Sequence, residues 1–174
     1  EKVRKDYFDA RKLVTIKQDK SIIYIDKLPL NIIHVGEIYR IFPNSKFIFA
    51  VRHPCDCVLS CFMQNFKLNN AMANFLNLND AAKLYDDVIY LWFKFKSILS
   101  INYYEVKYEN LINNFERTIK SVLNFLDLPW DSSVLKYYET AKDRNKINTP
   151  SYNQVTQPIY YHALNRWKNY SNEM

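Results

Sequence analysis

The sequence predicts an α/β fold in which a mainly parallel sheet is flanked by helices. Short runs rich in apolar, β-branched or aromatic residues occur at 21–25, 47–51 and 102–108, and such runs are typical of strands. Helical spacing of apolar residues fills the chain between them. Strands that alternate with helices favour parallel pairing through crossover connections. We therefore expect three strands in one domain covering residues 1–174.

Two helices are expected before the central strand. Apolar residues recur at helical spacing over 2–13. After the strand at 21–25, Pro29 prevents a helix from continuing through this point. Asn31 is then expected to cap a helix that runs to Ile41.

The strand at 47–51 leads directly into a turn and a helix over 56–66. Pro54 suits the first helical turn, where a missing N–H costs nothing. Arg52 then stands at the carboxyl end of the strand, where ligands of open α/β sheets bind. Ser60 lies about two turns into the helix. A guanidinium fork suits a phosphate, to which a hydroxyl can add another donor, although strand-tip arginines are often plain salt-bridge partners.

The second half continues the alternation of helices and strands. We expect an N-cap at Asn79 or Asp80 and another at Asp131, and we expect Pro129 to end a helix. Trp92, Phe93 and Phe95 are interpreted as core residues of their helix. The helical spacing places helices at 79–99, 115–126, 131–142 and 159–169, with a turn or short helix at 109–111.

Residues 143–158 are polar, contain two prolines and show no period. Long loops of this kind inside compact domains are commonly functional. Gly36 is the only glycine of the chain, so the sequence has no glycine-rich phosphate loop.

A net charge of +6 favours an anionic ligand without identifying it. The basic residues are scattered, which favours a solvated basic surface over a nucleic-acid patch, and no nucleic-acid partner is expected. No apolar stretch approaches the length of a membrane span. Cys55, Cys57 and Cys61 lack a nearby fourth ligand at zinc spacing. They are interpreted as packing residues in a reducing compartment, so we expect no metal and a cytoplasmic location.

Arg52 and Ser60, eight residues apart across a strand, a turn and a helix, resemble the 3′-phosphate-binding segment of sulfotransferases that use 3′-phosphoadenosine 5′-phosphosulfate. The similarity covers roughly residues 20–170. It is greatest to bacterial sulfotransferases that often carry tetratricopeptide repeats, and more distant to tyrosylprotein sulfotransferases. Further stretches that agree with the family, in order, are 26–31, 104–111, 125–129, 149–158 and the pair Arg166-Trp167.

The resemblance implies a P-loop-type sulfotransferase fold and a 3′-phosphoadenosine 5′-phosphosulfate donor, with adenosine 3′,5′-bisphosphate as the product. It implies catalytic roles for Lys27 and Ser151. Lys27 precedes Leu-Pro where relatives keep a catalytic group, and Ser151 resembles a loop serine near the phosphosulfate. The cofactor-binding residues that the resemblance implies are Arg52, Ser60, Tyr108, Gln154, Val155 and Arg166. Two alternatives stay open, namely that Lys27 is solvated or paired with Asp26 and that Tyr108 is a core residue at a strand end.

The sequence also departs from the family. The family's 5′-phosphosulfate loop and the acidic general base that follows it have no counterpart here, and both would lie upstream of residues 2–13. The chain starts without an initiator Met, so Glu1 is interpreted as an internal cut. We therefore expect a partial domain that lacks its N-terminal phosphosulfate-loop unit, holds the 3′-phosphate and adenine half-site, and is inactive alone.

Two functions are compatible with these observations. In the first, the full-length protein transfers a sulfuryl group from 3′-phosphoadenosine 5′-phosphosulfate to a hydroxyl or amine acceptor. In the second, the chain is a non-catalytic nucleotide- or polyanion-binding module. The sequence carries no signal for the acceptor, which could be a small molecule, a glycan or a peptide, nor for the oligomeric state. His34, His53 and His162 have no visible partner and are interpreted as structural or exposed.

Overall fold

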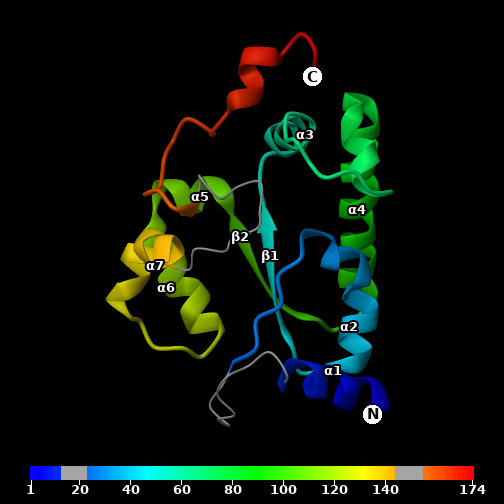
Figure 1. Ribbon diagram of the computed structural model, residues 1–174, viewed down its shortest axis with the longest axis vertical. Coiled ribbons are helices and arrows are strands. Elements are labelled where there is room, and N and C mark those ends of the chain that lie inside the picture. The colour runs from blue at the N-terminus through cyan, green and yellow to red at the C-terminus, as the bar shows by residue number, and fades with distance from the viewer. Residues whose placement is uncertain (13–22, 144–154) are drawn as a thin grey trace. The chain divides into compact units, whose positions relative to one another are not determined.

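The computed structural model describes residues 1–12, 23–143 and 155–174 (Figure 1). The chain folds into two compact units. The first unit comprises Glu1–Phe47 and Asp87–Asn102, and the second comprises Ile48–Asp86 and Tyr103–Met174.

The first unit is helical. Its elements are α1 (Lys2–Lys12), the 3₁₀ helix η1 (Pro29–His34), α2 (Val35–Ile41) and the later part of α4 (Leu78–Ile98). The Arg4 side chain binds the Ile41 carbonyl, with its Nε at 2.8 Å, and the Tyr7 ring packs edge-on against Phe42. Val35 and Trp92 are almost fully buried, so both α2 and α4 contribute to the interior of this unit.

The predicted strand at 21–25 is wrong for the residues that the structure describes. Residues 23–28 lie in neither a helix nor a strand, and Ile23 and Ile25 are 55% and 73% exposed. Composition alone does not decide whether a β-branched run becomes a strand, because strand propensity depends on the tertiary context. Ser21 and Ile22 lie outside the described residues.

Two further expectations in the first unit need correction. Asn31 lies inside η1 and caps no helix, because Leu28 has extended geometry and Pro29 takes the first helical position. The second helix does end at Ile41 as predicted. Phe93 is 56% exposed whereas its neighbour Trp92 is 2% exposed, because adjacent helical residues point in different directions.

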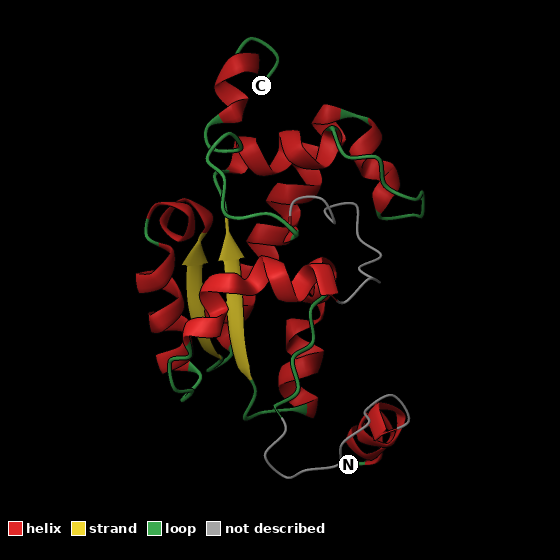
Figure 2. Cartoon of the chain, turned by 60° about the vertical axis from the view of Figure 1, so that its left-hand side comes forward, coloured by secondary structure: helices red, strands yellow, loops and turns green. Residues whose placement is uncertain are grey.

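The second unit contains most of the sheet. Strands β1 (Lys46–Val51) and β2 (Asn102–Lys107) pair side by side and run parallel (Figure 2). The predicted α/β class and the strands expected at 47–51 and 102–108 are thereby confirmed. Besides the start of α4, the helices of this unit are α3 (Pro54–Phe62), η2 (Met72–Leu76), α5 (Tyr108–Asn113), α6 (Phe115–Phe125), η3 (Ser132–Lys136), α7 (Tyr137–Asp143) and η4 (Arg166–Tyr170).

Helices α3 and α5 begin at the carboxyl ends of β1 and β2 (Figure 1). Helix α3 starts at Pro54 as expected, but it ends at Phe62 instead of reaching residue 66. Val58 and Leu59 anchor α3 because they are buried. Both strand tips therefore turn into helices at one edge of the sheet.

Two predicted helix boundaries differ from the structure. The start of α4 is capped by Asn77, whose side-chain oxygen accepts hydrogen bonds from the Asn79 and Asp80 amides, so neither of these two residues is the cap. Helix α6 ends before Pro129. Its end is made by Asp127, which has the left-handed φ of 59°.

The predicted cap at Asp131 is confirmed, since its carboxylate accepts a hydrogen bond from the Ser133 amide at 2.8 Å. The helix expected at 159–169 is much shorter, because only η4 is helical. Asn165 precedes η4 with a left-handed φ of 55°, and a right-handed helix cannot run through that conformation. Most of the loop expected at 143–158 lies outside the described residues. Among the described residues, no helix has the length and apolar character to cross a membrane.

Candidate functional site

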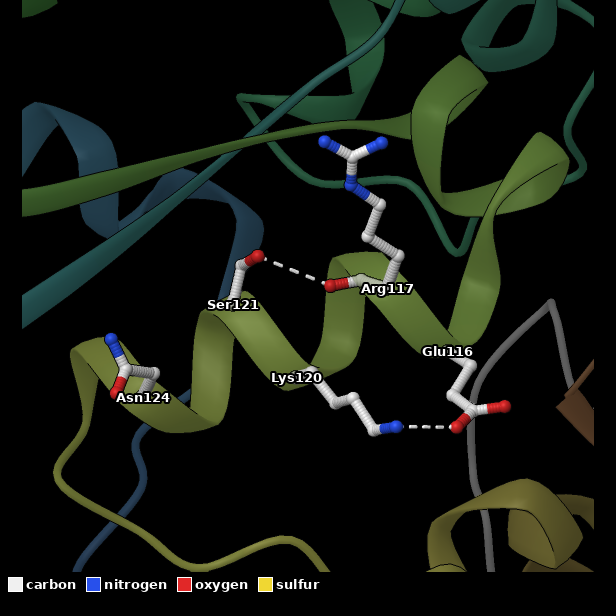
Figure 3. A pocket seen from close by; sticks show the side chains of 5 residues that line it. All are labelled: Glu116, Arg117, Lys120, Ser121 and Asn124. Carbon is white, nitrogen blue, oxygen red and sulfur yellow. Dashed lines mark hydrogen bonds and ion pairs between the residues drawn. The ribbon is translucent and has the colours of Figure 1, made fainter.

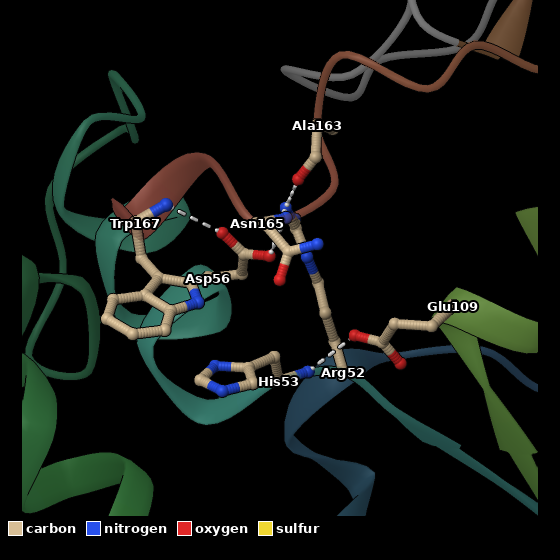
Figure 4. Close-up of polar contacts among 7 residues, drawn as sticks. All are labelled: Arg52, His53, Asp56, Glu109, Ala163, Asn165 and Trp167. Carbon is tan, nitrogen blue, oxygen red and sulfur yellow. Dashed lines mark hydrogen bonds and ion pairs between the residues drawn. The ribbon is translucent and has the colours of Figure 1, made fainter. Parts of the chain in front are cut away.

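The candidate site is built around Arg52, the first residue after β1. Its Nη2 donates to the carbonyl oxygen of Ala163 and lies 3.8 Å from Oδ2 of Asp56 (Figure 4). The guanidinium carbon is 4.8 Å from the centroid of the Tyr108 ring, within the range of a cation–π contact. The strand tip, α3, α5 and the carboxyl-terminal segment (residues 159–170) thus meet at one arginine.

The donors of Arg52 are only partly used. Its Nε is buried and has no hydrogen-bond partner among the described residues. A buried donor without a partner costs about 1–3 kcal/mol. A ligand that accepted a hydrogen bond from this Nε would remove that cost. A guanidinium with spare donors can bind a phosphate or a sulfate.

A cavity of about 520 Å³ opens beside Arg52, a volume within the usual range of small-molecule sites. It lies wholly in the second unit, between α3, α5, the start of α7 and the carboxyl-terminal segment. Five of the sequence-predicted cofactor residues line it together, namely Arg52, Ser60, Tyr108, Val155 and Arg166. Residues far apart in the chain therefore converge as a ligand site requires.

The remaining predicted site residues are Lys27, Ser151 and Gln154. Lys27 is exposed and lies in the first unit. Ser151 and Gln154 lie outside the described residues. The catalytic roles expected of Lys27 and Ser151 stay predictions.

The cavity wall is strongly aromatic. Burial raises the pKa of Tyr108, against the opposing effect of Arg52, and burial likewise raises the pKa of Tyr137 and Tyr160. These phenols therefore stay neutral at physiological pH. The Tyr160 ring stacks on His162 with a centroid separation of 4.2 Å, so the wall offers flat apolar surfaces suited to a nucleobase.

Several residues of the site were not singled out by the sequence. Asp56, four residues after Arg52, is almost fully buried. Its Oδ2 accepts a hydrogen bond from the Asn165 amide at 2.8 Å, and its Oδ1 accepts one from the Trp167 amide at 3.0 Å. The spacing from Arg52 was a usable signal, because residues four apart share a helix face. The backbone donors lie more than 100 residues away in the chain, and no sequence pattern predicts such a contact.

All three histidines have partners in the structure, of which only Glu37, three residues after His34, could be predicted from spacing. The His53 amide donates to Glu109 at 2.8 Å, and its ring stacks on Trp167. His34 pairs with Glu37 at 2.6 Å. Because His162 stacks on Tyr160 and lines the cavity, two of the three histidines belong to the site or to its immediate support.

The three cysteines are free thiols on α3. A hydrogen bond with the Cys61 thiol, helped by the charge of Arg52, lowers the pKa of Cys57 to about 7 against the effects of burial and of Asp56. The same hydrogen bond raises the pKa of Cys61. The two thiols, one helical turn apart, therefore have opposite protonation preferences.

A second hollow runs along α6 (Figure 3). It is lined by Glu116, Arg117, Lys120, Ser121 and Asn124. These side chains all come from one helix, and Glu116 and Lys120 satisfy each other at 2.6 Å. One helix face cannot surround a ligand, so this hollow is interpreted as ordinary charged surface.

The chain is similar in sequence to one protein family and to several known proteins. The model of the family described as "Sulfotransferase family" matches residues 3–132, most of the chain. An uncharacterized protein of Aquifex aeolicus is 31% identical over 84% of the chain and 19% of its own length. Protein-tyrosine sulfotransferase A of Caenorhabditis elegans is 26% identical over 86% of the chain and 40% of its own length. Protein-tyrosine sulfotransferase of Drosophila melanogaster is 26% identical over 82% of the chain and 29% of its own length. The chain thus spans well under half the length of these relatives.

Proposed function

Since the chain belongs to the sulfotransferase family, we propose that the cavity beside Arg52 binds the 3′-phosphate and adenine of 3′-phosphoadenosine 5′-phosphosulfate. We further propose that the whole protein transfers the sulfuryl group of this donor to a hydroxyl or amine. The observation that carries the proposal is the convergence of Arg52, Ser60, Tyr108 and Arg166 on one cavity.

The phosphate end of the proposed site consists of Arg52, Ser60 and Arg166. Arg52 has a buried Nε without a partner among the described residues, and Ser60 presents an exposed hydroxyl on the same cavity. Two guanidinium groups and a hydroxyl form a donor set suited to a dianionic phosphate. The residues present therefore fit the group that the family implies.

The adenine end of the proposed site is the aromatic wall. Tyr108, Tyr137 and Tyr160 are partly buried and line the cavity. An aromatic face gains about 1–3 kcal/mol from stacking on a base. The wall thus supports binding of a nucleotide over binding of a bare phosphate or an extended polyanion.

The proposal for turnover rests on the family resemblance. The bridging oxygen of the anhydride gains negative charge as it leaves, and a fixed cation stabilises that charge. We assign this task to Lys27, and a supporting role to Ser151. The matched relatives of Caenorhabditis elegans and Drosophila melanogaster are named protein-tyrosine sulfotransferases. For this chain the proposed acceptor extends only to a hydroxyl or amine.

Titration calorimetry with adenosine 3′,5′-bisphosphate tests the binding site. Arg52→Ala should weaken binding by about 1.5–3 kcal/mol, the cost of a lost charge-assisted contact. Arg117→Ala is the matched control, because it removes the same charge from α6 in the second unit but outside the cavity. Equal affinities of folded Arg52→Ala and wild-type protein would refute the assignment. Equal losses in both variants would indicate a nonspecific polyanion site.

A further inference from the structure

Asp56 occupies an unusual position for a carboxylate. It is almost fully buried, and it follows Arg52 by four residues, at the start of α3. A buried carboxylate is unfavourable unless its charge and its lone pairs are satisfied. The donors that bind the Asp56 carboxylate therefore identify the segment that this side chain holds in place.

Both carboxylate oxygens of Asp56 accept hydrogen bonds from the carboxyl-terminal segment. Oδ2 accepts the Asn165 amide and Oδ1 accepts the Trp167 amide (Figure 4). We call these two hydrogen bonds the Asp56 bridge. The bridge encloses Arg166, which lies between the two donors and lines the cavity. Fixing the amides on both sides of Arg166 restricts the backbone from which its side chain reaches out.

Arg52 binds the same segment at Ala163, two residues before Asn165. Its Nη2 donates to the Ala163 carbonyl and lies 3.8 Å from Asp56 Oδ2. The His53 ring, next to Arg52, stacks on Trp167 at 5.1 Å with an interplanar angle of 10°. One strand–turn–helix unit therefore holds residues 163–167 through a cation, an anion and a ring.

We propose that Asp56 is a positioning residue, which presents Arg166 to the phosphate end of the cavity by anchoring the backbone on either side of it. This inference rests on the function proposed above, and extends it to Asp56, which also lines the cavity but whose two oxygens accept hydrogen bonds from backbone amides. Arg52 contacts both the cavity and the anchored segment. Nucleotide binding and the anchoring of residues 163–167 are therefore coupled, and each strengthens the other.

Asp56→Asn is the principal variant. It keeps the shape of the side chain but retains only one acceptor oxygen, so one of the two amides faces an NH₂ group. The affinity for adenosine 3′,5′-bisphosphate should fall at least tenfold. Asp131→Asn is the matched control, because Asp131 also accepts a backbone amide in the second unit but lies outside the cavity. The affinity of Asp131→Asn for adenosine 3′,5′-bisphosphate should equal that of the wild type.

A double-mutant cycle separates positioning from general destabilisation. Arg166→Ala should weaken binding in the wild-type background and have less than a twofold effect in the Asp56→Asn background, where Arg166 is no longer presented. Independent losses that multiply in the double variant would overturn the proposal, and so would an unchanged affinity of folded Asp56→Asn protein.

A second pair of variants changes Asn165, the donor of one of the two hydrogen bonds of the Asp56 bridge. These variants test the proposal even if Asp56→Asn does not fold. Asn165 has a left-handed φ of 55°, which a β-branched residue disfavours and glycine accepts. Asn165→Val should reproduce the loss of affinity, and Asn165→Gly should stay within about threefold of the wild type, since only the backbone amide joins the bridge. The proposal fails if Asn165→Val binds as the wild type does.

Amide hydrogen exchange without nucleotide distinguishes failure of this inference from failure of the proposed function. Exchange at Asn165 and Trp167 should be faster in Asp56→Asn than in the wild type. Wild-type protein that binds no adenosine 3′,5′-bisphosphate refutes the proposed function and, with it, the positioning role. Wild-type protein that binds nucleotide while these amides exchange equally in both proteins refutes the bridge alone.

Discussion

At the scale of single residues, the site combines groups whose chemistry depends on close neighbours. Arg52 was identified from the sequence because it follows a strand, and the structure adds that it contacts Tyr108, Asp56 and Ala163. None of these contacts could be derived from spacing alone, except the one with Asp56 at i+4. The sequence thus predicted Arg52 and Tyr108, which line the cavity, but not the contacts that hold Arg52 in place.

The thiol pair on α3 gives a prediction for pH dependence. The pKa of Cys57 is lowered to about 7, so Cys57 should alkylate with iodoacetamide at a rate that is half-maximal near pH 7 and rises with pH, because the thiolate is the nucleophile. Mass spectrometry of the modified peptides measures this profile. Cys61→Ala should move the half-maximal rate to higher pH, while Cys55→Ala should leave it unchanged. A Cys57 profile that does not respond to Cys61→Ala contradicts the assignment of the hydrogen bond.

Lys27 gives a prediction about turnover by the complete protein. A cation that acts on charge developing in the transition state affects rate more than binding. Lys27→Ala should therefore lower the turnover rate about a hundredfold, the scale of losing one preorganised donor, without changing the affinity for adenosine 3′,5′-bisphosphate. Lys5→Ala, which removes an exposed lysine of α1 in the same unit, is the control. Normal turnover by Lys27→Ala would leave Lys27 as an ordinary surface residue.

At the scale of elements, helix spacing and strand runs predicted the middle of most elements better than their ends. Helices α3, α4 and α6 lie where the periodicity placed them, but their boundaries depend on particular side chains and backbone angles. Asn77 caps α4 from a position before the predicted start, and Asp127 ends α6 with a left-handed φ. A cap needs only one acceptor near free amides, which several nearby polar residues could supply.

The end of α6 gives a stability prediction. Asp127 adopts φ 59°, while the Leu128 amide bonds to the Leu123 carbonyl and the Asp127 amide to that of Asn124, the pattern of a Schellman motif. Asp127→Val should destabilise the fold by about 1–2 kcal/mol, because a β-branched residue is strained in the left-handed region. Asp127→Gly should stay within about 1 kcal/mol of the wild type. Urea unfolding measures both, and equal stabilities of the Val and Gly variants would contradict this account.

At the scale of the whole molecule, the sequence predicted the fold class and the family, and the structure and the comparisons confirm both. The strand expected at 21–25 fails over residues 23–25 because strand pairing is a long-range property, which local composition does not determine. The division into two units was also not predicted. Helix α4 crosses from one unit to the other without a break, so no linker marks the boundary.

The two units lead to a prediction about how a ligand stabilises the protein. Each unit has its own buried side chains, Val35 and Trp92 in the first, and Val58, Leu59 and Ile112 in the second. The cavity is lined by the second unit alone. A ligand stabilises only those opening reactions that disrupt its site, by about 2.7 kcal/mol at a hundredfold excess over its dissociation constant.

At that concentration of adenosine 3′,5′-bisphosphate, amides of α3 and α5 should therefore exchange more slowly by a factor of up to about 100. Amides of α1 and α2 should change little, because their local opening leaves the cavity intact. Hydrogen exchange followed by mass spectrometry measures both groups in one experiment. Arg52→Ala protein at the same nucleotide concentration is the control and should lose most of the protection of α3. Equal protection of α1, α2, α3 and α5 would indicate that the units open as one cooperative body, and protection confined to the first unit would place the nucleotide elsewhere.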